Sequence, residues 1–138
     1  MELTNIEMPP GEGKKESLTA LDVVDDKLCA VSSNGIIYIW KLLKTQKNVE
    51  YVNRIILPGK INATCLAVCG EALLCGGTSW HNHNREAILF VVNPHNYTVL
   101  QTIPGIGYDI SKLYTTPTNR VYALNDDGNK IYEGAIYS

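Results

Sequence analysis

The sequence predicts an all-β protein built from three repeated units, and two observations carry this prediction. First, an apolar residue followed by proline and glycine occurs three times, in Met8-Pro9-Pro10-Gly11, Leu57-Pro58-Gly59 and Ile103-Pro104-Gly105. The glycines at 11, 59 and 105 stand 48 and 46 residues apart. Second, short runs rich in Val, Ile, Tyr and Leu are bounded by Gly, Asn, Asp and Pro, and helical periodicity is almost absent. A fixed period in this range indicates a repeat architecture.

The first unit, residues 1–48, is expected to contain four strands. Their expected bounds are Leu3–Met8, Leu18–Val24, Lys27–Ser33 and Ile36–Leu42. Asn34-Gly35 separates the last two strands. An Asn-Gly pair between apolar runs favours a tight hairpin, because both residues tolerate a positive φ angle.

The second unit, residues 49–96, repeats this order. Its strands are expected at Tyr51–Leu57, Ile61–Cys69, Ala72–Ser79 and Ala87–Val92. Gly70-Glu71 forms a tight turn, and the next turn is expanded into a seven-residue loop, Trp80–Glu86.

The third unit, residues 97–138, is expected to contain four more strands. They are predicted at Thr98–Ile103, Tyr108–Tyr114, Arg120–Asn125 and Ile131–Tyr137. In all three units proline falls only between strands, where its missing N–H removes no ladder hydrogen bond.

Continuous apolar runs indicate that the sheets are covered on both faces. Such runs occur in Cys65–Cys69 and Ile88–Val92. Four-stranded meanders of this period with two buried faces are typical of propeller blades. We therefore expect a partial β-propeller of three four-stranded antiparallel blades in one domain, residues 1–138, in which each unit begins with its outermost strand and is complete.

The stretch Leu18–Lys41 resembles a repeat of the WD-repeat β-propellers. Ser32-Ser33 matches the serine region of the family pattern, and Asn34-Gly35 stands where Asp-Gly is usual. Trp40 matches the tryptophan, but Lys41 replaces the final aspartate. The family's Gly-His is absent from all three units, so its His–Asp–Ser–Trp tetrad cannot form in full.

The other two units resemble the family less closely. The second does so in Ile61–Gly77 and Ile88–Asn93, and the third keeps Asp127-Gly128. Kelch-type propellers rank second, because their Gly-Gly pair occurs once, at Gly76-Gly77.

Three blades are too few to close a ring, because propellers usually have four to eight. Three explanations remain open from the sequence. The chain pairs with itself to form a six-bladed homodimer, it completes a propeller with another protein, or it is a fragment of a longer chain.

Composition excludes several classes of function. A net charge of −2 gives no basic surface for nucleic acid. No run reaches the ~20 apolar residues of a membrane helix, and the N-terminus resembles no signal peptide. We therefore expect an intracellular protein, cytoplasmic or nuclear. Its cysteines, at 29, 65, 69 and 75, are expected to be free and buried.

The expanded turn is the best candidate for a functional site, because tryptophan and arginine are enriched at binding hot spots. The resemblance to WD repeats implies that it shares one rim of the propeller with Asn34, Gly59-Lys60, residues 105–108 and Asp126-Asp127. The residues expected to bind a protein partner are Trp80, His81, Asn82, His83, Arg85, Lys60 and Tyr108. A metal held by His81 and His83, with His95 or a cysteine as the third ligand, is the weaker interpretation of the same histidines, and we predict no metal site.

No enzyme signature survives inspection. Gly11–Lys15 lacks the first glycine of a phosphate loop, and Asn125–Gly128 lacks the ligands of a calcium loop. We therefore expect no catalytic residue, no cofactor and no small-molecule substrate. The predicted function is a non-catalytic interaction scaffold that presents a loop-lined rim to a protein or peptide. The alternative is a structural subunit whose blades complete a propeller with a second copy or another chain.

Overall fold

The computed structural model describes residues 1–9, 16–44, 49–81, 84–125 and 130–136 of the 138-residue chain. The first sheet contains β1 (Leu18–Val24), β2 (Lys27–Ser32), β3 (Ile36–Leu42) and β4 (Val49–Ile56). The second contains β5 (Ile61–Cys69), β6 (Ala72–His81), β7 (Asn84–Asn93) and β8 (Thr98–Pro104). The third contains β9 (Ile110–Thr115), β10 (Arg120–Asn125) and β11 (Ile131–Ala135).

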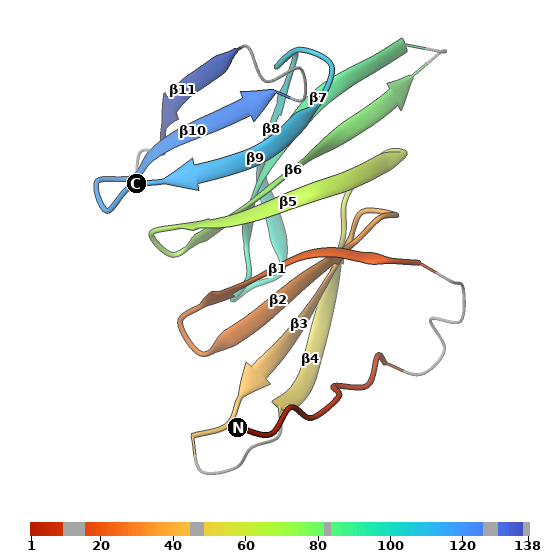
Figure 1. Cartoon of the computed structure of the whole chain (residues 1–138), viewed down its shortest axis with the longest axis vertical. Helices are drawn as coiled ribbons and strands as arrows, with labels where there is room; N and C mark the ends of the chain where they lie inside the picture. Colours follow the sequence, from red (N-terminus) through yellow and green to blue (C-terminus); the bar gives the residue numbers. More distant parts are fainter. Residues whose placement is uncertain (10–15, 45–48, 82–83, 126–129, 137–138) are drawn as a thin grey trace.

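Each sheet is an antiparallel meander, and the three sheets stack face to face with the second in the middle (Figure 1). The first strands of the sheets, β1, β5 and β9, lie next to one another across the stack. The later strands fan outward from this inner row. The all-β prediction and the expected blade-like arrangement are confirmed, and the described residues include no helix that could span a membrane.

The sheets are offset from the expected units. Strand β4, predicted to open the second unit, pairs with β3 as the outermost strand of the first sheet. Likewise β8 pairs with β7 rather than with any strand of the third sheet. The sheets therefore span residues 18–56, 61–104 and 110–135, instead of 1–48, 49–96 and 97–138.

Two further expectations about the blades were wrong. Residues 1–9 contain no strand, so the strand predicted at Leu3–Met8 is absent. The third sheet has three described strands instead of four, because the first strand of its unit belongs to the second sheet. Hydrophobic pattern alone predicts that a segment can be a strand, but its partner depends on which sheet edge it reaches.

The inner strands are tied across the stack by threonine hydroxyls. Thr19 lies at a register shift of β1, and its hydroxyl donates to the Ala63 carbonyl of β5 at 3.0 Å. Thr64 lies at the equivalent shift of β5 and donates to the Ile110 carbonyl of β9 at 2.7 Å. The bulge directs each side chain out of its own sheet, so the same device fixes both spacings.

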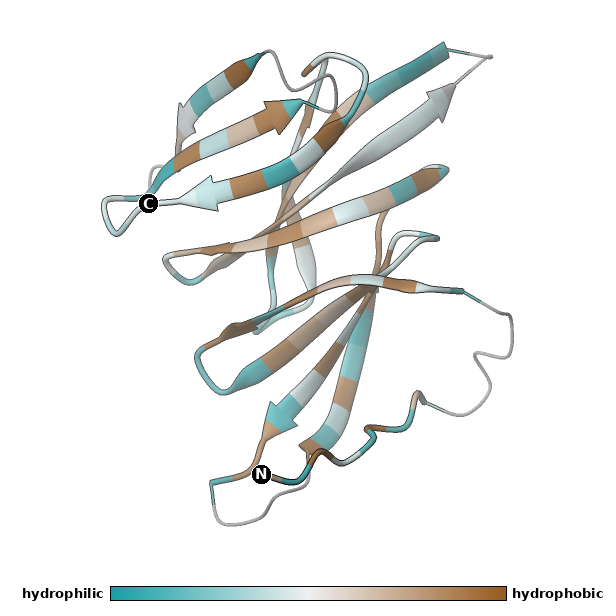
Figure 2. Cartoon of the chain, viewed as in Figure 1, coloured by the Kyte–Doolittle hydropathy of each residue, from teal (hydrophilic) through white to brown (hydrophobic). Residues whose placement is uncertain are grey.

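Two layers of apolar side chains fill the spaces between the sheets. Between the first and second sheets lie Ile37, Leu73 and Phe90, each 0% exposed. Between the second and third lie Leu74 and Ile110. Figure 2 shows that the start of β7, beyond these layers, is hydrophilic, and Asn84, Arg85 and Glu86 there are exposed. The core therefore holds the base of the β6–β7 hairpin and leaves these residues in solvent.

All four cysteines are free and buried, as predicted. Burial raises the pKa of the Cys29 thiol from 9.0 to about 12, and the Asp22 carboxylate adds to this effect. Burial also raises the pKa of Cys75. These thiols act as small core side chains.

A methyl group at Gly77 should destabilise the protein. A Cβ there would lie 2.6 Å from the Asn62 carbonyl oxygen and 2.9 Å from the Ala63 Cα, both backbone atoms of β5. Overpacking of this kind costs about 1–3 kcal/mol, so Gly77→Ala should lower the urea midpoint. Gly134→Ala is the control, because a Cβ there meets nothing within 4 Å. Equal midpoints for the two variants would contradict the close approach of β5 and β6.

Stability should fall at alkaline pH because of the buried thiols. The folded chain holds the Cys29 proton up to about pH 12, whereas the unfolded thiol loses it near pH 9.0. The contribution is therefore complete below pH 9.0 and is lost as the pH rises toward 12. Urea unfolding at increasing pH should show this decline, and a Cys29→Ala variant should show a shallower one. The same slope in both proteins would contradict the assignment.

Candidate interaction site at the β6–β7 hairpin

The segment predicted as a seven-residue loop is mostly a β-hairpin. Ser79 pairs with Glu86, Trp80 with Arg85, and His81 with Asn84. Strands β6 and β7 thus extend past the core and carry Trp80 and Arg85 on a regular backbone. The residues at this end of the hairpin are polar, and their polarity led to the wrong prediction of a loop. Their cross-strand pairing is set instead by the register of the buried part of the hairpin.

The hairpin brings Trp80, Arg85 and Tyr108 together. The Arg85 guanidinium carbon lies 5.8 Å from the centre of the Trp80 ring and 6.0 Å from the centre of the Tyr108 ring. Both rings are well exposed, Trp80 at 50% and Tyr108 at 65%. A guanidinium over aromatic rings is attracted by their negative faces. These three residues, all predicted from the sequence to lie on one rim, form one surface group, which we name the aromatic–arginine cluster.

Asp109 anchors this cluster to the fold. Its carboxylate forms an ion pair with Arg85, with Nη2 at 2.9 Å, and it also accepts a hydrogen bond from the hydroxyl of Thr78. Thr78 is 3% exposed and the Asp109 side chain 16% exposed. The connection that carries Tyr108 and Asp109 is itself held to the hairpin, because the Ala87 N–H donates to the Gly107 carbonyl at 2.8 Å. The guanidinium is therefore positioned before any partner binds.

A shallow depression lies beside the cluster. It has a volume of about 570 Å³ and is lined by Ser33, Asn34, Gly59, Lys60, Ile61, Asn62 and Trp80. The backbone N–H of Trp80 donates to the Lys60 carbonyl at 3.3 Å, which ties the hairpin to the β4–β5 connection. The expected grouping of Asn34 and Gly59-Lys60 with the hairpin on one rim is thus the observed arrangement.

Some predicted residues are not described. Asn82, His83 and Asp126-Asp127 lie outside the described residues, and only the backbone of His81 is described. His95 lies beyond the opposite end of β7, where its Nε2 contacts Asp25 at 3.0 Å. A ten-residue strand is roughly 33 Å long, so His95 does not share a metal site with the hairpin.

Asp109 and Thr78 were missed by sequence reasoning. Thr78 falls in an apolar run, where a threonine is read as a strand former. Asp109 follows Tyr108 directly and could have been included in the predicted rim. Its place next to a residue of the predicted rim was the available signal.

The fold has counterparts among solved structures. A chain of the Chaetomium thermophilum Polycomb Repressive Complex 2 bound to GSK126 matches with a TM-score of 0.72 and 16% identity, over 91% of this chain and 30% of that one. The Myceliophteria thermophila Cps50 (Swd1) beta-propeller domain matches at 0.65 and 12% identity, over 87% and 38%. The RRP9 WD40 repeats match at 0.61 and 18% identity, over 88% and 39%.

The fold is that of a partial β-propeller, as in the matched WD40 repeats. The chain spans between 30% and 39% of the length of the three matched propeller chains. No protein-family model and no curated protein matches the sequence. The resemblance of Leu18–Lys41 to a WD repeat therefore agrees with the fold.

The two roles of Asp109 should be separable by mutation. Asp109→Ala leaves the buried Thr78 hydroxyl without its acceptor, which costs about 1–3 kcal/mol. Asp109→Asn keeps an acceptor for Thr78 and removes only the charge attraction to the exposed Arg85, worth about 1 kcal/mol or less. Urea unfolding should therefore rank wild type above Asn and Asn above Ala. If Asn is as unstable as Ala, the Thr78 hydrogen bond is not the main anchor.

Proposed function

We propose that this chain is a non-catalytic scaffold whose WD40-type rim binds a protein or peptide partner. The observation that carries the proposal is the aromatic–arginine cluster, in which Trp80 and Tyr108 are exposed while Arg85 is fixed between them by Asp109. Exposed aromatic rings around an ordered guanidinium have the residue types of binding hot spots. Because the cluster is ordered in advance, little side-chain entropy is lost when a partner binds.

The chemistry of the rim favours a partner with an acidic and an apolar side chain. The exposed Lys60 and the outward donors of Arg85 offer positive charge, and Trp80 offers an apolar face beside the 570 Å³ depression. The depression is lined by Asn34 and Asn62, whose amides can pair with the backbone of an extended peptide. We also propose that the protein acts inside the cell, because four free buried thiols fit a reducing compartment.

A second candidate function is assembly into a larger propeller. It is favoured by a specific observation, the third sheet, which has three described strands where the first two sheets have four. The free strand edge that results is a template for pairing with another chain. The two functions use different parts of the molecule, the rim for recognition and the last sheet for assembly.

Peptide selection tests the rim. The purified chain would be used to select binders from a random peptide library, and the Kd of a selected peptide would be measured with variants. The double variant Trp80→Ala with Arg85→Ala should weaken binding by roughly tenfold to a thousandfold, since hot-spot truncations cost about 1–4 kcal/mol.

The control is Leu100→Ala, which changes a 58%-exposed apolar side chain of β8. It should leave the Kd unchanged. Thermal unfolding of the double variant should stay close to that of wild type, because Trp80 is 50% exposed and the Arg85 side chain 43% exposed. A drop as large as that of a core substitution would show that the cluster is structural, and unchanged peptide binding would remove the rim from the proposed function.

A further inference from the structure

In the repeat pattern, residues 3–8 hold the place of the fourth strand of a sheet, but in the single chain they form no strand. Strand β4 precedes Pro58-Gly59 and is the fourth strand of the sheet before β5. Strand β8 ends in Pro104, precedes Gly105 and is the fourth strand of the sheet before β9. Residues 3–8 precede Pro9-Pro10-Gly11 in the same way and lead to β1. By the rule of the other two copies, they belong to a sheet that precedes the first.

A matching place is open at the other end of the stack. Strand β11 pairs with β10 on one side, and no described strand pairs with its other edge. Beside it, between the second and third sheets, lies a mostly apolar cavity of about 260 Å³ lined by Val91, Ile103, Tyr132 and Ile136, among others. A fourth strand would cover this cavity, as β4 and β8 complete the first two sheets.

The bulge residues point to a further sheet beyond the third. Thr19 and Thr64 each bond a carbonyl of their own sheet and one of the next sheet. Ser111 holds the equivalent bulge of β9, but among the described residues its hydroxyl bonds only the carbonyls of Leu124 and Asn125 in its own sheet. The carbonyl that accepts from each threonine belongs to the residue just before the bulge of the next sheet, Ala63 or Ile110. The residue at that place in the first sheet is Leu18.

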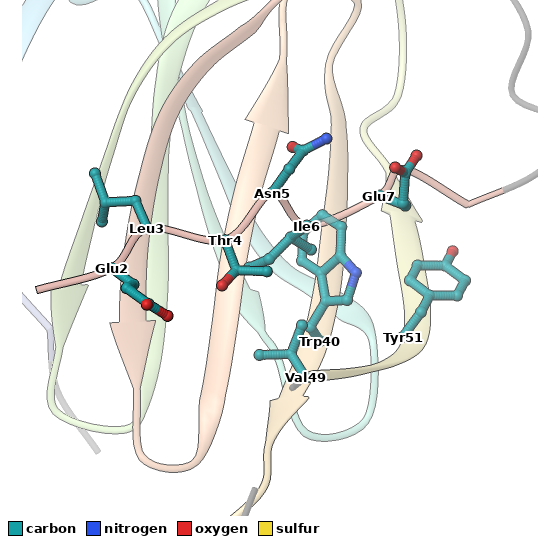
Figure 3. Close-up of a pocket in the computed structure, with 9 residues that line it drawn as sticks. All are labelled: Glu2, Leu3, Thr4, Asn5, Ile6, Glu7, Trp40, Val49 and Tyr51. Carbon is teal, nitrogen blue, oxygen red and sulfur yellow. The ribbon is translucent and has the colours of Figure 1, made fainter. Parts of the chain in front are cut away.

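In the single chain, the N-terminal segment lies over an end of the stack. Residues 2–7 line a cavity of about 580 Å³ together with Trp40, Val49 and Tyr51 (Figure 3). These side chains belong to the face of the first sheet that points away from the second, where Tyr38 and Trp40 form a separate apolar cluster. The segment makes no strand there. This face is the one that another sheet would cover in a continued stack.

We propose that residues 3–8 of one copy add to β11 of a second copy as its fourth strand, and that the exchange is reciprocal. Each N-terminal segment then completes the third sheet of its partner, and the first sheet of each copy packs on the third sheet of the other. Ser111 thereby acquires the Leu18 carbonyl of the second copy as its missing acceptor. Residues 3–8 lie by the first sheet, at the far end of the stack from β11, so in this arrangement they do not reach β11 of their own chain (Figure 1).

Reciprocal exchange closes the assembly. Two identical contacts related by a twofold axis leave no free edge, whereas a one-way exchange would extend into a filament. Residues 9–17 join the donor segment to β1, a longer connection than residues 57–60 or 105–109 in the other units. The proposal deepens the assembly function and rests on it, and it is independent of the rim.

The expected register identifies the residues to test. Ile37, Leu89 and Ile131 hold equivalent places on the third strand of each sheet, opposite Val31, Gly76 and Leu124. On the fourth strands, Ile55 pairs with Ile37 and Ile103 pairs with Leu89. Ile55 stands three residues before Pro58, and Ile103 stands directly before Pro104. Ile6 and Met8 stand at those two distances from Pro9. Both are on the strand face that meets Ile131, and Glu7 is on the opposite face.

Disulfide trapping with full-length chains tests the exchange. Ile6→Cys or Met8→Cys, combined with Ile131→Cys, should give a covalent dimer on a non-reducing gel after mild oxidation. Glu7→Cys with Ile131→Cys is the matched control and should give little dimer, because its side chain leaves the opposite face of the strand. These positions are exposed, with Ile131 at 72%, and the native cysteines are buried, so the substitutions should not disturb folding.

Light scattering after size exclusion separates this inference from assembly in general. The wild type should elute with twice the mass of one chain. A monomer at all concentrations would overturn both the exchange and assembly with a second copy. A dimer whose trapping does not depend on strand face would overturn the exchange and leave self-assembly standing. A ladder of larger oligomers would overturn reciprocity.

Discussion

The constraint on which this structure depends is that the second β-sheet is apolar on both faces. Phe90 is buried against the first sheet and Leu74 against the third. The outer sheets are buried on the face that meets the second sheet. The other face of the third sheet carries the exposed ion pair of Arg120 with Glu133. The order of the stack therefore follows from the middle sheet, which needs a neighbour on each side.

The same constraint positions the rim. The buried halves of β6 and β7 fix the register of the hairpin, so that Trp80 and Arg85 are cross-strand neighbours at its tip. Packing of the third sheet against the second brings Tyr108 and Asp109 within reach of Arg85. The site therefore combines residues of the second sheet with residues of the connection that leads to the third, and its order depends on how the two sheets pack. The scaffold is rigid where it is packed and carries its chemistry on connections and strand ends.

Much of the fold could be predicted, because β-strands leave local signals. Asn34-Gly35 and Gly70-Glu71 mark turns through positive φ angles, which the structure confirms at Gly35 and Gly70. The free, buried cysteines were equally readable from their apolar neighbours. The assignment of strands to sheets was not readable, since β4 and β8 look alike whether they open one sheet or close another. The anchoring of Arg85 by Asp109 was missed because it joins two sheets.

The sequence by itself determined the strand content, the period of the repeat, most turns and the residues that project from the rim. These follow from side-chain periodicity and backbone preference, which act within a few residues. Only the tertiary structure decided that the hairpin is paired to its tip, that Thr78 and Asp109 hold the aromatic–arginine cluster, and that the third sheet has three described strands. Those features depend on which edges and faces meet, and such contacts join residues that are distant in the chain.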